Sequence, residues 1–205
     1  MVANSTRDRL VERREAVTAE ILEAAWDVAH SEGLAGLSLR DVARRIGMRP
    51  PSLYWYFDSK RAIYEAMFVQ GNQQLLARLA EQRWPREPRA FLLLCARVFV
   101  TFSMEDMQRY QLLFQRTIPG FEPSADAYAV ALQVFDDMRE RFADAGLGGA
   151  EAFDIWTALV SGLSAQQNAN DPGGDRWLRL IDDVVDMYLA HTMKTKSNGP
   201  KGKDT

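Results

Sequence analysis

The amino-acid sequence predicts an all-α protein of about nine helices. Apolar residues recur at intervals close to 3.6 along almost the whole chain, which is typical of amphipathic helices. No stretch of four to eight residues alternates apolar and polar side chains as a half-buried strand would. Breaks that contain glycine or proline separate the periodic segments. The chain of 205 residues is 47% hydrophobic and 26% charged, a composition typical of a folded globular protein rather than a disordered one.

The first helix is expected over residues 15–31, after an N-terminal arm, residues 1–14, that we expect to be flexible. Gly33 can adopt the left-handed conformation that commonly ends a helix. Ser38, followed three residues later by Asp41, has the spacing of a capping box. A second, short helix should therefore begin at Ser38.

Gly47 is expected to end the second helix and to form the turn that follows it. Pro50 and Pro51 suit the first turn of a third helix, because a proline there removes no intrahelical hydrogen bond. This third helix should be short and should end near Tyr56 or Phe57.

Asp58 and Ser59 are expected to cap a long fourth helix over residues 60–81, which the prolines near position 85 end. Five further helices are expected at residues 89–104, 106–117, 123–145, 149–169 and 175–193. The tail, residues 194–205, carries four lysines and no apolar residue, so we expect it to be disordered.

Residues 38–57 have the pattern of a helix-turn-helix, which is two short helices joined by a turn that contains glycine. The first helix offers the small Ala43 for close packing against the second. Such packing allows the second helix to project into the major groove of DNA.

The third expected helix, which is the second helix of the motif, has an unusually aromatic end. Leu53 and Phe57 are four residues apart and share one helix face, which we expect to be buried. Tyr54, Trp55 and Tyr56 lie between them, and one helix cannot bury all three on that face. At least Tyr54 or Trp55 should therefore face outward, where it could contact DNA phosphates and base methyl groups.

Charge is unevenly distributed along the chain. The formal net charge is −3, yet residues 38–61 contain six basic and two acidic side chains. A local basic patch favours a nucleic-acid partner, although solvated helix faces would give the same pattern.

One segment resembles the DNA-binding part of the TetR family of regulators. It reads Leu37-Ser-Leu-Arg-Asp-Val-Ala-Arg-Arg-Ile-Gly-Met-Arg-Pro-Pro-Ser-Leu-Tyr-Trp-Tyr-Phe-Asp-Ser-Lys60 and shares the family ending Leu-Tyr-x-x-Phe-x-x-Lys. The resemblance extends over residues 18–68 and is greatest to members with a Pro-x-Leu-Tyr-Trp recognition helix. It implies a three-helix DNA-binding domain over residues 15–60 and a larger ligand-binding and dimerisation domain over residues 61–193.

The resemblance also implies roles for individual residues. Ser38 would cap the second helix and touch a phosphate, and Arg40 would reach a guanine. The other residues expected at the DNA are Arg49, Pro50, Pro51, Ser52, Tyr54, Trp55, Tyr56 and Lys60. The residues at positions 49 and 50 differ from those of relatives in charge and hydrogen bonding, so the operator sequence of a relative cannot be assumed for this chain.

Further arginines leave two interpretations open. Arg44 and Arg45 either contact DNA or form a solvated or ion-paired surface. The arginines of the N-terminal arm either follow a phosphate or enter a minor groove, or lie in solvated disorder; they are Arg7, Arg9, Arg13 and Arg14.

The C-terminal helices are expected to serve dimerisation and ligand binding, as in the family that the motif resembles. Candidate dimer residues are Phe153, Leu159, Leu163, Trp177, Ile181, Val184 and Tyr188. Candidate pocket residues are Phe99, Phe102, Tyr110, Phe114, Tyr128 and Trp156. An aromatic pocket with few polar groups would suit a hydrophobic or aromatic effector, although each of these side chains could instead fill the core.

Enzyme and metal chemistry are not expected. The sequence has no glycine-rich phosphate loop and no Gly-x-Ser-x-Gly elbow. One cysteine and two distant histidines do not make a structural zinc site. The resemblance implies a transcriptional repressor without a cofactor, whose partners are operator DNA, a second copy of the chain and a small effector, and we expect it to be cytoplasmic.

Two other classes of function remain open at this stage. One is a helical ligand-binding or protein-docking module that no longer meets DNA. The other is a membrane-associated protein that uses the apolar segment 90–102, which is shorter than a membrane span requires.

Overall fold

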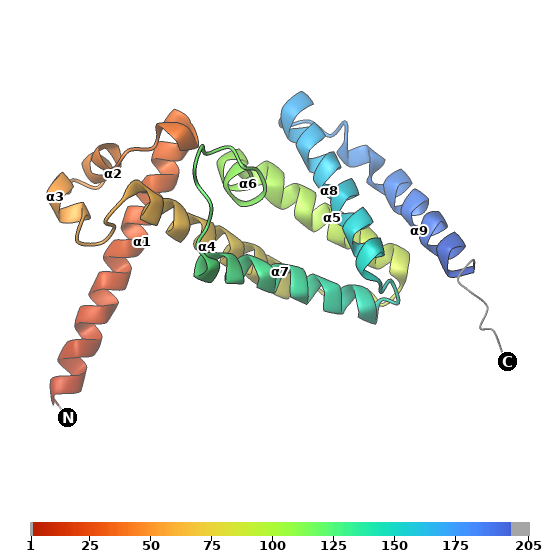
Figure 1. The fold of residues 1–205 in the computed structure, drawn as a ribbon, viewed down its shortest axis with the longest axis horizontal. Coiled ribbons are helices and arrows are strands. Elements are labelled where there is room, and N and C mark those ends of the chain that lie inside the picture. The colour runs from red at the N-terminus through yellow and green to blue at the C-terminus, as the bar shows by residue number, and fades with distance from the viewer. Residues whose placement is uncertain (1, 198–205) are drawn as a thin grey trace. The chain divides into compact units, whose positions relative to one another are not determined.

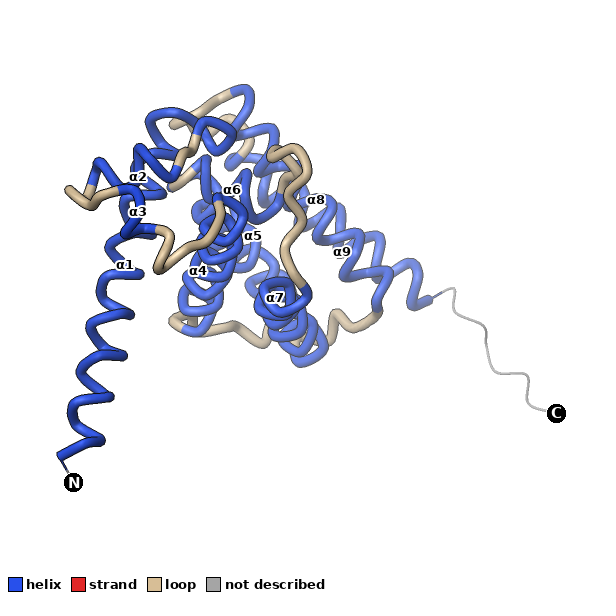
Figure 2. The backbone as a smooth tube through the Cα atoms, turned by 60° about the vertical axis from the view of Figure 1, so that its left-hand side comes forward, coloured by secondary structure: helices blue, strands red, loops and turns tan. Residues whose placement is uncertain are grey.

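The computed structural model describes residues 2–197, and within that range the regular elements are helices without strands (Figures 1 and 2). The all-α prediction is confirmed. The helices are α1 Val2–Gly36, α2 Leu39–Arg45, α3 Pro50–Leu53, α4 Lys60–Ala80, α5 Pro88–Glu105, α6 Met107–Phe114, α7 Ala125–Asp144, α8 Ala150–Asn170 and α9 Ile181–Ser197, with a short 3-10 helix at Leu178–Leu180.

The chain forms two compact units. Unit 1 contains the residues up to Gln73 together with Gln108–Ala131, and unit 2 contains Gln74–Met107 and the residues from Leu132 onward. Unit 1 thus includes the expected domain 15–60 and adds α6 and the first part of α7. Helices α4 and α7 each contribute residues to both units.

Unit 1 has one hydrophobic core, to which all its helices contribute. Ile21 and Ala25 of α1 are fully buried, as their spacing predicted, and so are Val42 and Ala43 of α2. Helix α2 packs against both α1 and α3. The turn after α2 contains Gly47 with φ +66°, a conformation that favours glycine.

Helix α1 differs from the prediction at both ends. It begins at Val2 rather than residue 15, so the segment expected to be a flexible arm is helical in its described part. Four of the residues before position 15 are arginines, and arginine is a good helix former. Gly33 has φ +75° as expected, but helical structure resumes after this kink and continues to Gly36.

Helix α3 ends at Leu53, earlier than the expected position near residue 56. Tyr54, Trp55 and Tyr56 form a turn rather than a further helical turn. The peptide N–H groups of Tyr56 and Phe57 both donate to the carbonyl of Leu53, at 2.9 and 3.0 Å. This turn brings Phe57 back to the core.

Unit 2 is built on α5, which packs against α8 and α9. Its core contains edge-on aromatic contacts, in which the ring of Phe142 lies 5.1 Å from that of Phe91 and 5.1 Å from that of Phe153. Arg89 of α5 pairs with Asp182 and Asp186 of α9 at its surface, at 3.2 and 2.7 Å. Aromatic packing and ion pairs thus both join α5 to its neighbours.

Two predictions for the C-terminal half were wrong in detail. The helix expected over residues 106–117 ends at Phe114, and the helix expected from residue 175 starts as the 3-10 turn. The expected disorder of residues 194–205 fails for 194–197, which continue α9 to Ser197, because lysine is a good helix former that also suits a helix C-terminus. Residues 198–205 lie outside the described part.

Candidate nucleic-acid interface

The N-terminus of α2 is held by Ser38. Its hydroxyl oxygen accepts a hydrogen bond of 3.2 Å from the peptide N–H of Asp41 and donates to the Asp41 carboxylate. The predicted cap is thus confirmed, but Asp41 bonds the serine hydroxyl rather than its backbone N–H, so the reciprocal half of a capping box is not formed. The cap fixes the start of α2, where Arg40 is exposed.

The aromatic turn after α3 presents two rings to solvent. Trp55 is 81% exposed and Tyr54 is 53% exposed, whereas Leu53 and Phe57 are buried in the core. The predicted division between buried and outward residues is confirmed. The turn therefore exposes two aromatic side chains that are consecutive in the sequence.

Lys60 is already engaged within the chain. Its ammonium group donates a hydrogen bond of 2.8 Å to the carbonyl of Ala35 and lies 5.3 Å from the ring centre of Tyr64. Ala35 is in the last turn of α1, where a positive charge is favoured by the helix dipole. A phosphate contact by Lys60 would have to compete with this bond.

The remaining predicted residues of the motif lie on unit 1. Arg49, Pro50 and Pro51 are exposed, and Ser52 and Tyr56 are half-buried. Pro50 and Pro51 occupy the first two positions of α3, as expected. Their contact with DNA stays a prediction.

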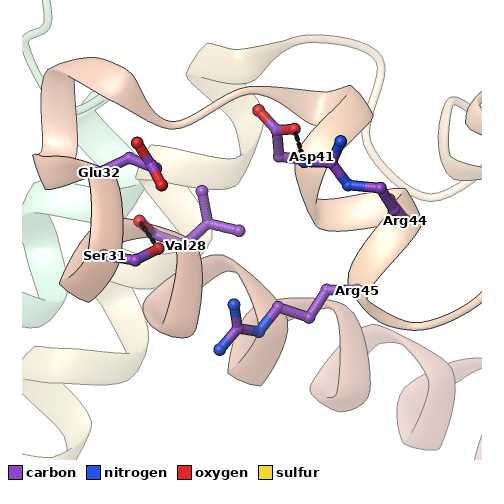
Figure 3. Close-up of a pocket in the computed structure, with 6 residues that line it drawn as sticks. All are labelled: Val28, Ser31, Glu32, Asp41, Arg44 and Arg45. Atoms are coloured by element: carbon purple, nitrogen blue, oxygen red, sulfur yellow. Dashed lines mark hydrogen bonds and ion pairs between the residues drawn. The ribbon is translucent and has the colours of Figure 1, made fainter.

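Arg44 and Arg45 line a surface hollow of about 460 Å³ between α1 and α2 (Figure 3). The other lining residues are Val28, Ser31, Glu32 and Asp41. Arg44 pairs with Asp41, and Arg45 pairs with Asp27 at 3.0 Å. The structure therefore shows the ion-paired surface that was one of the two interpretations for these arginines.

One contact at this interface was missed from the sequence. The guanidinium of Arg14 lies 3.4 Å from the carbonyl oxygen of Trp55, to which it donates, and 5.9 Å from the ring centre of Tyr56. These residues are 41 positions apart along the chain. No local pattern links them, since the contact depends on how α1 packs.

Comparison with known families assigns the N-terminal segment. Residues 21–67 match the family model described as bacterial regulatory proteins, tetR family. Residues 21–67 are therefore similar to members of this family. The matched segment begins in the middle of α1 and ends within α4, and it includes the capped α2, the aromatic turn and Lys60.

Two curated relatives extend the match by different amounts. The HTH-type transcriptional regulator YobS of Bacillus subtilis (strain 168) is 31% identical over 91 residues, which is 44% of this chain and 48% of the relative. The tetracycline repressor protein class A from transposon 1721 of Escherichia coli is 26% identical over 164 residues, 76% of this chain and 69% of the relative. The chain thus spans about half of the first relative and two thirds of the second.

A solved structure shares the fold over most of the chain. The regulatory protein SCO4313 superposes with a TM-score of 0.71 at 22% identity, over 87% of this chain and 98% of the other. At this identity the likeness establishes the fold alone. The TetR architecture, a helix-turn-helix followed by a larger helical part, is confirmed.

The predicted pocket residues fall in both units. Phe99, Phe102 and Trp156 belong to unit 2, and the other three candidates belong to unit 1. The indole N–H of Trp156 donates to the sulfur of Cys95 at 3.4 Å, and burial raises the pKa of that thiol to about 12. Trp156 therefore serves core packing, and its contact with a ligand stays a prediction.

Four predicted dimer residues are already buried within unit 2: Phe153, Leu163, Ile181 and Tyr188. They have little surface left for a partner. Leu159, Trp177 and Val184 are half-buried. Sequence periodicity missed Met187, which is 63% exposed, because a spacing of 3.6 cannot distinguish a core-facing stripe from an outward one.

The described residues include neither a membrane-spanning helix nor a cluster of metal-ligating side chains. Within residues 2–197, no helix is long and apolar enough to cross a membrane. The same residues contain no group of three or more histidine, cysteine or acidic side chains placed to hold a metal ion.

Proposed function

We propose that the chain is a ligand-responsive, one-component transcriptional repressor. It binds a pseudo-palindromic operator as a homodimer and is released by a small hydrophobic or aromatic effector. The observation that carries this proposal is the aromatic turn after α3, in which the outward Tyr54 and Trp55 lie between the buried Leu53 and Phe57 along the chain.

The chemistry of the turn suits a DNA groove. An indole and a phenol offer flat apolar faces to thymine methyl groups together with polar tips for phosphates. Arg40, at the start of α2, and Arg49, before α3, add positive charge on the same unit. Arginine is the side chain best suited to bind guanine with two hydrogen bonds. We assign base reading to this surface, which includes the Pro-x-Leu-Tyr-Trp sequence.

A pseudo-palindromic operator has two half-sites, and a dimer supplies one recognition segment for each of them. A dimer places two recognition segments about 34–36 Å apart, in successive major grooves of one DNA face. Leu180, Val184 and Met187 succeed one another at helical spacing and retain exposed apolar surface. We assign them, with Leu159 and Trp177, to the subunit interface.

Release by an effector requires that it binds the two forms of the protein unequally. To shift the ratio of the DNA-binding form to the other form from 99:1 to 1:99, the effector must bind the form that does not bind DNA more tightly by about 5.5 kcal/mol. Helix α4 starts at Lys60, beside the aromatic turn, and continues into unit 2. We assign transmission to this helix. A relative named as a tetracycline repressor supports the class of mechanism.

The test is a binding titration with the duplex that the wild-type protein enriches from a random library. Arg40→Ala should lose about 1–3 kcal/mol of binding free energy and relax the preference at one base pair. Trp55→Ala should also weaken binding. Arg116→Ala, which removes a side chain that is 90% exposed in unit 1, is the matched control. Unchanged affinity and base preference in both test variants would refute the assignment.

A further inference from the structure

The contact between Arg14 and the aromatic turn links a residue near the start of the described chain to the proposed recognition surface. The guanidinium donates to the carbonyl oxygen of Trp55 at 3.4 Å and lies 5.9 Å from the ring centre of Tyr56. One cation thus contacts two consecutive residues of the turn, one through its backbone and the other through its ring.

The buried Leu53 and Phe57 and the hydrogen bonds to the Leu53 carbonyl hold the two ends of the turn, whereas the Trp55 side chain between them is less constrained. Helix α3 ends at Leu53, so residues 54–56 lie outside its regular hydrogen-bonded ladder. The N–H of Trp55 donates to the carbonyl of Ser52 at a long 3.3 Å, and its side chain is 81% exposed. The direction of this exposed side chain therefore depends on the contacts that the backbone of Trp55 and its neighbours make.

We infer that Arg14 is a positioning residue that orients the Trp55 and Tyr56 turn for base reading. This inference rests on the proposed function, since it assigns DNA reading to the turn. Arg14 acts through the turn and needs no contact with DNA. The guanidinium satisfies the Trp55 carbonyl and lies over the Tyr56 ring, which fixes the direction in which the indole leaves the backbone.

The alternative role for an exposed arginine on this unit is a direct phosphate contact. The two roles differ in salt dependence. The slope of log K against log salt is negative, and each phosphate contact that is lost makes it shallower by about 0.9. Loss of a positioning contact leaves that slope unchanged and relaxes the base preference instead.

The neighbouring Arg13 provides a matched control. It is exposed, lies on the same helix and carries the same charge, but the contacts with the turn are made by Arg14. Arg14→Lys adds a second comparison, because lysine keeps the charge but lacks the planar guanidinium that donates to the Trp55 carbonyl and lies over the Tyr56 ring.

The experiment compares the full chain carrying Arg14→Gln, Arg14→Lys or Arg13→Gln with the wild type. Each protein is titrated at several salt concentrations against the duplex selected by the wild type, against single-base variants of it and against random duplex. For Arg14→Gln we expect about three- to tenfold weaker binding to the selected duplex. We also expect a relaxed base preference, the wild-type salt slope, and an affinity for random duplex equal to that of Arg13→Gln.

Arg14→Lys should resemble Arg14→Gln in its base preference. If Arg14→Lys bound the selected duplex as tightly as the wild type and Arg14→Gln had a shallower salt slope, the inference would be overturned in favour of a phosphate contact. Identical behaviour of Arg14→Gln and Arg13→Gln would also overturn it. If the wild type selected no duplex, the proposed function itself would fail, which is a separate and recognisable outcome.

Discussion

The guanidinium of Arg61 donates a hydrogen bond of 2.7 Å to the backbone carbonyl of Glu122. Arg61 is in the first turn of α4, and Glu122 lies in the connection between α6 and α7. Next to this bond, the rings of Tyr64 and Phe121 are 5.4 Å apart. Together these contacts attach the α6–α7 connection to the helix that follows the aromatic turn, and they explain why residues 108–131 belong to unit 1.

Removing the Arg61 bond should loosen this connection. In Arg61→Met we expect amide hydrogen exchange in residues 115–124 to become about two- to tenfold faster, the equivalent of a hydrogen bond worth about 0.5–1.5 kcal/mol. Arg116→Met is the control, since Arg116 pairs with the Glu122 carboxylate while being 90% exposed, and such pairs contribute little. Equal exchange rates in the two variants would contradict this role of Arg61.

The core and outward residues of the aromatic turn should respond differently to truncation. Leu53 is fully buried, so Leu53→Ala should reduce the free energy of unfolding by about 2–5 kcal/mol through lost burial and a cavity. Tyr54→Ala removes an exposed ring and should change it by no more than about 0.5 kcal/mol. Urea denaturation measures both, and a comparable loss in the two variants would show that the turn packs differently.

The thiol of Cys95 should be unreactive in the folded protein. Burial raises its pKa from the ordinary value near 9 to about 12, which leaves about a thousandfold less thiolate at pH 8. Reaction with a disulfide reagent at pH 8 should therefore be slow until urea unfolds the chain. Rapid labelling in the absence of urea would mean that α5 and α8 do not enclose this thiol.

The ion pairs between α5 and α9 should make stability depend on acid pH. The hydrogen bond from Arg89 lowers the pKa of Asp186. Its stabilisation is therefore complete above about pH 4, the ordinary range for an unfolded aspartate, and is lost as the pH falls through the lowered folded value.

The melting temperature of the wild type should accordingly exceed that of Asp186→Asn at pH 7, and the difference should shrink below about pH 4. Arg89→Gln removes the other partner and should give the same profile. A difference that stayed constant between pH 7 and pH 3 would contradict a stabilising pair.

Much of unit 1 could be predicted from the sequence because its signals are local. The spacing of Ser38 and Asp41 predicted a cap, and Gly47 predicted a backbone of positive φ. The helical period separated the buried Leu53 and Phe57 from the outward Trp55. Each of these inferences depends on residues within a few positions of one another.

The contacts that were missed are those between distant segments. Arg14 and Trp55 are 41 residues apart, and Arg61 and Glu122 are 61 apart, so only the packing of helices brings them together. The same limit applies to unit 2. Its apolar stripes were visible in the sequence, but whether Tyr188 or Met187 faces the core depends on where α5 and α8 lie.

The central claim is that the chain reads DNA as a symmetric dimer. The measurement that tests it most directly is the selection of duplexes from a random library by the purified protein, followed by titration of the best duplex at several salt concentrations. We expect a consensus with two-fold symmetry whose half-sites are one helical turn apart. The absence of any enrichment over random duplex would contradict it and would favour a helical ligand-binding or docking module.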